Sequence, residues 1–403
     1  MSYVEGGLVL WPLSPNWKKT VKETLEYRTR IIGPTYTGLR QKRRMRIAPR
    51  RSFAFEVHPY DKSKRLLDNL RFSHGAREWA MPVFHDRQRL ASTLAEGETT
   101  IPCATVDYDF ADGRYAVLCN HNRFITKFEI VQLTTVGSGV LNLAAPTEEE
   151  WPAGSFLYPI RMARLDFNSN NASILNGKVS TLSVVMDVTE PCDWPEHEFA
   201  DEYRGRPVWE FGNNWRSGRS FGFNRIIETV DNDTSMPVHF DFPNKTFAAL
   251  DTEWQVHGRA AQSVQRSALY ALLGRYTSVW VPTLTEDLKP LLTIGSASTT
   301  VTVEYCGYTL FGLGQEGRQD IRIELYDGTV YYRRITGSNE VLGVEQLTIN
   351  TALGAEVTIA QIRRISFMML MQQASDSITI TNHAGGDGAA TAPVVFEGVV
   401  EPP

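Results

Sequence analysis

A series of short motifs in residues 1–192 recurs in the same order in residues 200–403, and this repetition restricts the possible folds more than any other feature. Each match alone is weak, but the shared order is not expected by chance. The offset grows from 198 to 211 along the chain, as expected if loops lengthened after a duplication. The matches are Asn16-Trp17 with Asn214-Trp215, Phe53 and Phe55 with Trp254 and Val256, Pro82 with Pro282, Leu141-Asn142-Leu143 with Leu347-Thr348-Ile349, Ile160-Arg161 with Ile362-Arg363, Ala172-Ser173 with Ala374-Ser375, Val184-Val185 with Val394-Val395, and Glu190-Pro191 with Glu401-Pro402.

This repeat is the length of a domain or a compact pair of domains, because solenoid repeats run only roughly 20 to 50 residues. Two similar units in tandem can occupy neighbouring positions in a ring, so three such chains present six quasi-equivalent units. The simpler interpretation is a monomer with two fused domains. The repeat therefore predicts a ring-forming subunit, with the monomer as its alternative.

The composition is that of an ordinary globular protein, with 42% hydrophobic and 22% charged residues. Its formal net charge of -5 gives no general attraction to nucleic acid or to anionic membranes. No segment approaches the roughly 18 uninterrupted apolar residues of a membrane span, and residues 1–19 lack the features of a secretory signal. We therefore expect a protein that is made in the cytosol. The four cysteines lack CxxC spacing, which argues against zinc or a disulfide framework, and we expect buried thiols at Cys103, Cys119, Cys192 and Cys306.

Hydrophobic periodicity predicts a strand, strand, helix, strand unit in each half. In the first half, alternation predicts paired strands within residues 20–57, a helix over Asp61 to Phe72 that Gly75 closes, and a strand at Trp79 to Phe84. The second half repeats this order. Its elements are strands around Phe221 with Phe223 and Trp254 with Val256, a helix near Gln262 to Leu273 ending at Gly274, and a strand at Thr277 to Leu284.

The remainder of each half is predicted to be rich in strands. Asp112-Gly113 and Asp327-Gly328 each separate two alternating runs, and Asp-Gly in this setting is a strong hairpin signal. The two hairpins would join Val106–Ala111 to Arg114–Cys119 and Ile321–Tyr326 to Thr329–Ile335. Further strands are expected at Phe124–Leu133, Phe156–Phe167, Ser180–Val188, Val301–Leu310, Gln361–Leu370 and Ser377–Thr381.

The fold class is therefore mostly β (α+β), a tandem duplication in which each half is a strand-strand-helix-strand unit plus a β-sandwich or barrel domain. An acidic, proline-bracketed segment provides the best linker. The expected divisions are a first β-rich unit with a helix at 1–95, a first barrel or sandwich at 96–192, the linker at 193–207, a second β-rich unit with a helix at 208–290, and a second barrel or sandwich at 291–403.

A search for catalytic motifs finds no GxSxG, HExxH, Walker loop or Rossmann fingerprint, so we expect no enzyme, no metal and no cofactor. His58, His74 and His85 lie near one another in the sequence, but the second half does not repeat them. Three adjacent carboxylates at 148–150 are expected to form a solvated turn rather than a calcium site.

The sharpest chemical signal is electrostatic. Seven cations and no acid occur within twelve residues between the first paired strands, whereas the equivalent connection of the second half is acidic. Complementary loops can fix partner and register, so we expect the basic loop of one half to contact the acidic loop of the next, within or between chains. A solvated edge hairpin or a contact with nucleic acid are the alternatives. The basic residues are Arg40, Lys42, Arg43, Arg44, Arg46, Arg50 and Arg51, and the acidic ones Glu228, Asp231, Asp233, Asp241 and Asp251.

Nine tryptophans give a somewhat high aromatic content. Trp11, Trp17, Trp215 and Trp280 lie at repeat positions, where core packing is favoured over partner contact. Trp17 and Trp215 are kept as contact candidates.

Leu10-Trp11-Pro12, Pro15-Asn16-Trp17, residues 23–29, the basic run and residues 49–55 together carry a family resemblance. This segment resembles the start of structural tail proteins of long-tailed bacteriophages, of the distal-tail and baseplate-hub kind. The resemblance covers mainly residues 8–57. It implies β-sandwich or barrel domains flanked by a helix, and hexameric rings or trimers whose duplicated domains imitate six-fold symmetry.

The expected function is therefore a noncatalytic virion protein, assembled in the host cytoplasm, that forms a ring at the tail tip or baseplate. Its expected partners are itself, as a homotrimer or else a homohexamer, the tail tube protein, the tape-measure protein, and hub or fibre proteins. No membrane and no specific nucleic acid are expected as partners. A carbohydrate- or receptor-binding module, with aromatic residues beside Asn213 and Asn214, is the alternative. An enzyme with a pocket containing His74, His85 and a carboxylate is a third class.

Overall fold

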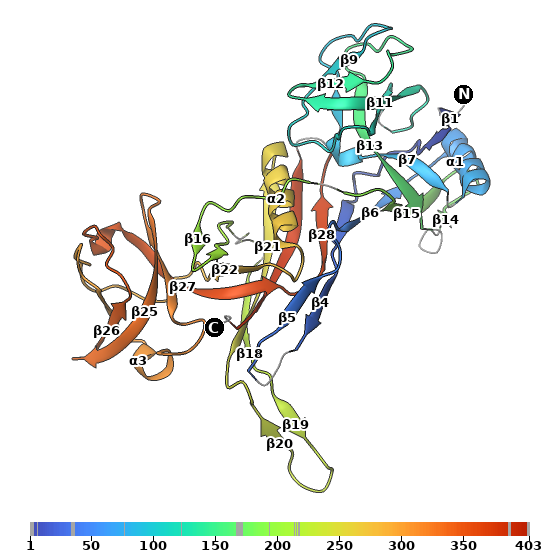
Figure 1. The fold of residues 1–403 in the computed structure, drawn as a ribbon. Coiled ribbons are helices and arrows are strands. Elements are labelled where there is room, and N and C mark those ends of the chain that lie inside the picture. Colours follow the sequence, from blue (N-terminus) through green and yellow to red (C-terminus); the bar gives the residue numbers. More distant parts are fainter. Residues whose placement is uncertain are drawn as a thin grey trace.

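The computed structural model describes residues 4–5, 7–33, 37–75, 77–121, 123–166, 172–192, 194–212, 214, 216, 218–385 and 388–400. These residues form large antiparallel sheets with three helices, so the prediction of a mostly β fold is confirmed (Figure 1).

The first half contains one helix, α1 (Asp61–His74), which Gly75 closes by donating its backbone N–H to Arg71 O, as predicted. Its strands are β1 (Val4–Glu5), β2 (Leu8–Leu10), β3 (Val21–Glu26), β4 (Thr29–Ile32), β5 (Gln41–Arg44), β6 (Arg50–Val57), β7 (Glu78–Pro82), β8 (Gln88–Arg89), β9 (Thr100–Pro102), β10 (Tyr115–Cys119), β11 (Phe128–Gly137), β12 (Val140–Leu143), β13 (Phe156–Leu165), β14 (Ala172–Ile174) and β15 (Ser180–Val188).

The second half contains α2 (Arg259–Leu272) and a four-residue helix, α3 (Tyr308–Phe311). Its strands are β16 (Glu202–Tyr203), β17 (Arg206–Pro207), β18 (Ser220–Asn224), β19 (Glu228–Val230), β20 (Val238–Phe240), β21 (Phe247–His257), β22 (Ser278–Pro282), β23 (Thr300–Glu304), β24 (Asp320–Leu325), β25 (Val330–Val341), β26 (Val344–Ile349), β27 (Ile362–Gln373), β28 (Ser377–Asn382) and β29 (Ala389–Gly398).

The two halves share their strand partners as well as their element order. Even the irregularities correspond, because a register shift follows Leu133 in β11 and Ile335 in β25. A common ancestral origin of the halves stays a prediction, but their topology is the same. The corresponding pairs are β3–β6 and β18–β21, β6–β15 and β21–β29, β14–β15 and β28–β29, β13–β15 and β27–β29, β7–β13 and β22–β27, β10–β13 and β24–β27, β10–β11 and β24–β25, β11–β12 and β25–β26, and β9–β12 and β23–β26.

Eight of these strands form one continuous antiparallel sheet, which we call the ribbon. Its order is β18–β21–β29–β28–β3–β6–β15–β14, so β18 and β14 are its two ends. Its six inner strands alternate buried side chains with more exposed ones, which is the pattern of a sheet with one face packed and one face solvated. Figure 1 shows α2 lying along the ribbon, with two smaller β-rich units projecting from it.

Within the part of the chain that the structure describes, the first half has two hydrophobic clusters, and the second half has three. In the first half, the ribbon strands, β7 and α1 enclose one cluster around Trp11 and Trp79, and residues 90–157 enclose another around Trp151. In the second half, one cluster lies around Trp254 and also takes in Leu25 and Tyr27 of the first half, residues 288–367 enclose another, and a small third cluster lies around Trp280. Trp11 and Trp280 are buried, as expected for core residues.

Two local predictions are wrong. Val106–Ala111 is a loop rather than a strand, because its Asp109 carboxylate turns inward to pair with buried arginines. The strand expected at Val301–Leu310 ends at Glu304, and Gly307 at positive φ then begins α3. The division of the chain at the acidic linker, 193–207, stays a prediction; the described residues of this segment are exposed or partly buried, and the Trp194 indole N–H donates to Ser267 Oγ of α2 at 3.0 Å.

The repeat is also displaced in three strands. Asn16 and Asn214 donate backbone N–H groups to Glu56 O and Glu253 O, so Phe55 corresponds to Thr252 rather than to Val256. Ile160 lies opposite Pro82 and Met368 lies opposite Pro282, so Ile160 corresponds to Met368 rather than to Ile362. Ser173 lies opposite Thr181 and Thr381 lies opposite Thr391, so Ser173 corresponds to Thr381 rather than to Ser375. All three errors are even numbers of residues, since a strand pattern of period two looks unchanged after such a slide.

Among the described residues, no helix combines the length and the apolar character needed to cross a membrane.

Candidate functional site

The two halves meet where β28 pairs with β3, and this contact together with the cover that α2 provides is called the junction. The strands pair antiparallel from Ser377 opposite Glu26 to Asn382 opposite Val21. Thr24 Oγ1 and Thr379 Oγ1 are hydrogen-bonded across the pair at 3.0 Å. The junction therefore makes a single sheet out of two topological units.

Helix α2 covers β3 from the packed side. Leu25 is fully buried in the same cluster as Leu269, and the rings of Tyr27 and Tyr270 meet edge to face with centroids 6.2 Å apart. Gly274 follows α2 at positive φ, and a Cβ there would lie 3.0 Å from Tyr27 Cβ and 2.7 Å from Asp376 Oδ1. The close approach of the halves therefore requires a residue without a side chain at this position.

A buried ion-pair network crosses the junction. The Glu23 carboxylate of β3 accepts from Arg51 Nε and from Arg266 Nη2, each at 2.6 Å, and all three side chains are almost fully buried. Arg51 also pairs with Asp109, which in turn pairs with Arg161. Because an unpaired buried charge is costly, the network specifies which surfaces come together.

A second group of charges extends the network along α2. Arg259 at the start of α2 pairs with the buried Asp86 and donates from Nε to Asp107 O at 2.9 Å. His85 Nε2 lies 3.0 Å from both Asp86 Oδ1 and Arg266 Nη2. The first turn and the middle of α2 are thus both fixed to the first half.

The pKa values reflect this pairing. Burial would raise the pKa of Glu23, but Arg266 and Arg51 outweigh it and hold the pKa at about 2. Burial opposes ionisation of Asp109 as well, and Arg51 and Arg161 nevertheless lower its pKa. Burial lowers the pKa of His85 to about 4, although Asp86 and Glu23 oppose this. At neutral pH the acids are charged and His85 is neutral.

The structure brings part of the predicted basic loop to the second half. Arg40 Nη1 pairs with Glu397 at 2.7 Å, and Lys42 Nζ donates to Ser278 Oγ at 2.8 Å. Burial lowers the pKa of Lys42 to about 8. Arg46 donates to Glu26 O at 2.9 Å, and Arg44 donates to the carbonyls of residues 46 and 47. The side chains of Arg43 and Arg50 are exposed.

The predicted acidic loop is a hairpin of β19 and β20 on which Glu228, Asp231 and Asp233 are exposed. Asp241 at its base pairs with Arg225 at 2.5 Å. Within the described residues of one chain, no ion pair joins the basic loop to this hairpin, so the intrachain form of the charge hypothesis is wrong. A contact between neighbouring copies stays a prediction.

Of the two tryptophan candidates, the structure places Trp17 and not Trp215, which lies outside the described residues. Trp17 is half-buried beside the turn between β28 and β29, where a Cβ on Gly385 would lie 3.2 Å from its Cζ2. Trp17 is therefore a contact residue of the junction. Asn213 also lies outside the described residues, and the Asn214 amide donates to Glu253 Oε2 at 3.0 Å and to Gln255 Oε1 at 3.2 Å.

Strand β18 is the counterpart of β3, but within the described residues its side chains are much less covered than those of β3. Phe221 lies opposite Leu250 as Glu23 lies opposite Phe53, and the next inward positions are Phe223 and Leu25. Glu23 and Leu25 are fully buried, whereas Phe221 and Phe223 are 38% and 54% exposed.

The counterparts of β28 and α2 are likewise exposed. Strand β14 carries exposed Ile174, and Leu175 next to it is also exposed. Phe72 stands eleven residues after the start of α1, as Tyr270 does in α2. Phe72 is 93% exposed, whereas Tyr270 is 5% exposed.

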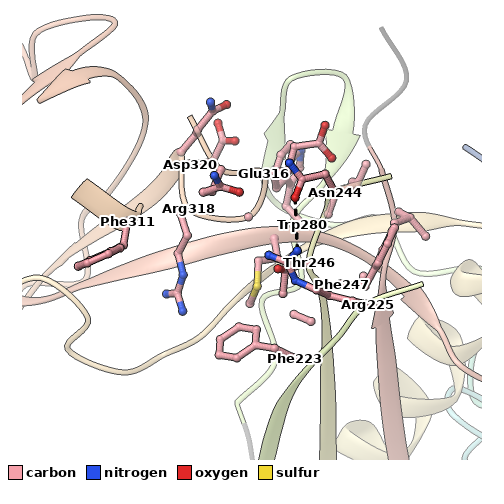
Figure 2. A pocket seen from close by; sticks show the side chains of 18 of the residues that line it. Phe223, Arg225, Asn244, Thr246, Phe247, Trp280, Phe311, Glu316, Arg318 and Asp320 are labelled. Atoms are coloured by element: carbon pink, nitrogen blue, oxygen red, sulfur yellow. Dashed lines mark hydrogen bonds between the residues drawn. The ribbon is translucent and has the colours of Figure 1, made fainter. Parts of the chain in front are cut away.

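A cleft of about 340 Å³ lies beside β18. Figure 2 shows Phe223, Arg225 and Arg318 around it, and the Arg318 guanidinium lies 5.3 Å from the Phe223 ring centroid. The buried Asp320 accepts from the Tyr203 hydroxyl at 2.7 Å. The cleft therefore combines an apolar edge with cations, and it opens where the junction would lie in the other half.

The residues considered for enzyme chemistry are placed apart or paired. His74 Nε2 contacts Glu78 O at 2.8 Å, whereas His85 belongs to the buried network. Glu149 pairs with Lys127, and the backbone N–H of Glu148 donates to Glu129. Among the described residues, no group of His, Cys, Asp and Glu has the arrangement of a metal site.

The cysteine prediction holds for Cys119 and Cys192, which are buried, and Cys103 is partly buried. It is wrong for Cys306, which is exposed, because it lies in the loop between β23 and α3 with its thiol 3.3 Å from Glu345 Oε2. All four cysteines are free.

Comparison with protein-family models and with curated protein sequences gave no match.

Proposed function

We propose that this chain is a noncatalytic structural protein of a virion, which forms a closed ring at the tail tip or baseplate of a long-tailed bacteriophage. One observation carries the proposal. Within the ribbon, the junction joins two similar units. The two ends of the ribbon, β14 and β18, expose the counterparts of the surfaces that form this junction.

Head-to-tail repetition of one contact gives a ring when the rotation closes and a filament when it does not. Each chain contributes two units, so a homotrimer presents six and matches the symmetry of a six-fold tail tube. A homohexamer is the other closed form. The trimer is favoured because a duplicated chain reaches six positions with three copies.

The solvated face of the ribbon suits the wall of such a ring. It carries polar side chains along every long strand, including the carboxylates of Glu56, Asp187, Asp251 and Glu253. The opposite face is covered by the helices and the hydrophobic clusters. A sheet with one polar and one apolar face can separate a water-filled channel from a packed interior.

The resemblance of residues 8–57 to tail proteins supplies the proposed location. In that position the ring joins the tail tube to hub or receptor-binding proteins, and it contacts the tape-measure protein during assembly. The β19–β20 hairpin, which projects from the rest of the chain in Figure 1, and the β4–β5 hairpin are available for axial contacts with these partners.

Light scattering of the purified full-length chain tests the ring. We expect a species of three times the 45.4 kDa chain mass, or six times for the hexamer, and annular particles in electron micrographs. Gold-labelled antibodies against the chain should mark the tail tip of phage particles. A monomer at tens of micromolar together with glycan binding would instead support the carbohydrate-binding module.

A further inference from the structure

The two ends of the ribbon are edge strands whose outer sides have no strand partner among the described residues. Strand β14 pairs with β15 and strand β18 pairs with β21, and neither pairs further. Exposed edges are ready templates for pairing with another chain, and natural proteins usually block them with charge or proline. Here they carry Ile174, Phe221 and Phe223, which are exposed apolar side chains.

The junction supplies a register for these edges. Within the chain, Thr381 of β28 lies between Thr391 of β29 and Lys22 of β3. Ser173 occupies the corresponding position in β14, because it lies opposite Thr181 of β15. Ser220 corresponds to Lys22, because it lies opposite Asp251 of β21 as Lys22 lies opposite Ala54 of β6.

Helices α2 and α1 provide the side chains that cover the strands at these contacts. In the junction α2 buries β3, with Tyr270 packed on Tyr27. Phe72 of α1 has the position of Tyr270, and Arg225, two residues after Phe223, has the position of Tyr27. An aromatic ring beside an arginine is a favourable pair, and covering Phe221 and Phe223 removes apolar surface from water.

We propose that β14 of one copy pairs antiparallel with β18 of the next copy, with Ser173 opposite Ser220 and with Phe72 of α1 packed against Arg225. This contact, which we call the seam, rests on the proposed ring and names the surfaces that close it. The occupant is a second copy of this chain, since the chain carries both halves of the contact at opposite ends of one sheet. The seam lacks the buried ion pair of the junction, because Phe221 replaces Glu23 and Asp68, which pairs with Lys64, replaces Arg266.

Disulfide cross-linking tests the register. In a Cys306→Ser background, which removes the exposed native thiol, Ser173→Cys with Ser220→Cys should give covalent dimers and trimers after mild oxidation. The matched intrachain pair, Lys22→Cys with Thr381→Cys, occupies the equivalent register. Its two engineered thiols should form a disulfide within one chain, so no covalent dimer or trimer should appear. Ser173→Cys with Asn224→Cys is the off-register control, because four residues displace the thiol by about 13 Å along the strand.

The outcomes separate the seam from the ring. Cross-linked trimers from the first pair and none from the off-register pair support the seam. Rings in light scattering without cross-linking, or equal cross-linking by both pairs, overturn the seam and leave the ring intact. A monomer in light scattering overturns both. Phe72→Glu, at an exposed position, should keep the thermal midpoint of the chain while abolishing oligomers, and normal oligomers from this variant would also overturn the seam.

Discussion

Strands β3 and β18 occupy the same place in the two halves, yet their inward side chains are chemically opposite. Strand β3 presents Glu23 and Leu25, which α2 of the same chain buries, whereas β18 presents Phe221 and Phe223 to solvent. A buried carboxylate requires partners at fixed positions, and a covalently linked second half can guarantee them. Apolar side chains depend less on exact geometry. The contact inside the chain is therefore specified by charge, whereas the proposed seam would rely on shape and apolar area.

The largest change in the free energy of unfolding is expected from substitution of Glu23. Glu23→Gln leaves Arg51 and Arg266 buried without their anion, so we expect the free energy of unfolding to fall by about 3 to 5 kcal/mol in urea titrations. Glu26→Gln on the same strand removes a half-exposed partner of Arg46 and should cost about 1 kcal/mol or less. Equal costs for the two variants would show that the network does not specify the junction.

The next largest effect is expected in the pH dependence of the free energy of unfolding, to which the junction contributes through His85 and Glu23. His85 has a pKa of about 4 in the folded chain and about 6.5 unfolded, so the unfolded state takes up the proton first as pH falls. Stability is therefore complete above pH 6.5 and decreases by roughly 3 kcal/mol as pH falls to 4. The Glu23 carboxyl, whose folded pKa is about 2, adds a further loss from about pH 4.5 down to that value.

Thermal melts between pH 8 and 3 measure this decrease, and His85→Gln should flatten it between pH 6.5 and 4. An unchanged slope in that variant would assign the pH dependence to other groups.

Truncation of the two equivalent helix aromatics compares covered and uncovered positions. Tyr270→Ala removes a buried ring from the junction, so the free energy of unfolding should fall by about 3 kcal/mol. Phe72→Ala removes an exposed ring and should change it by less than about 0.5 kcal/mol. Urea titrations of dilute protein measure both values, and a large cost for Phe72→Ala would mean that α1 is packed within the single chain.

The smallest expected difference is between the two glycines that follow the helices. Gly75 and Gly274 both have positive φ, so alanine at either position costs about 1 kcal/mol through backbone strain. Only at Gly274 does a Cβ also meet Asp376 and Tyr27, so Gly274→Ala should cost about 1 kcal/mol more. Differential scanning calorimetry at one scan rate can resolve this difference, and equal midpoints would mean that the junction has room at this point.

The sequence predicted local structure where one residue type decides the geometry. Gly75 ends α1 as expected, and Asp327-Gly328 lies between β24 and β25 as expected. Asp112-Gly113 carries the same signal, but the residues before it form a loop because Asp109 is drawn into the buried network. Long-range pairing thus overrides a local preference that is correct elsewhere in the same chain.

The candidate site was predicted only in part, for the same reason. The basic run stands out in the sequence, and Arg40, Lys42 and Arg51 do contact residues of the second half or the junction. Glu23 and Arg266 are single charges in an ordinary strand and an ordinary helix, separated by 243 residues. Only the fold shows that they meet. The alternation of Phe221 and Phe223 predicts a strand. Their exposure to solvent could not be predicted, because it depends on which elements lie beside that strand.

The junction is already formed within each chain, and this reduces the number of contacts that must form between separate molecules. Because two units are always delivered together in their final orientation, half of the contacts around any closed particle exist before the first encounter between molecules. Growth proceeds in steps of two, and an odd number of units is never reached. In the proposed ring, the polypeptide link halves the number of molecules that must lose their translational freedom. Every second contact is then intramolecular, so dilution does not weaken it.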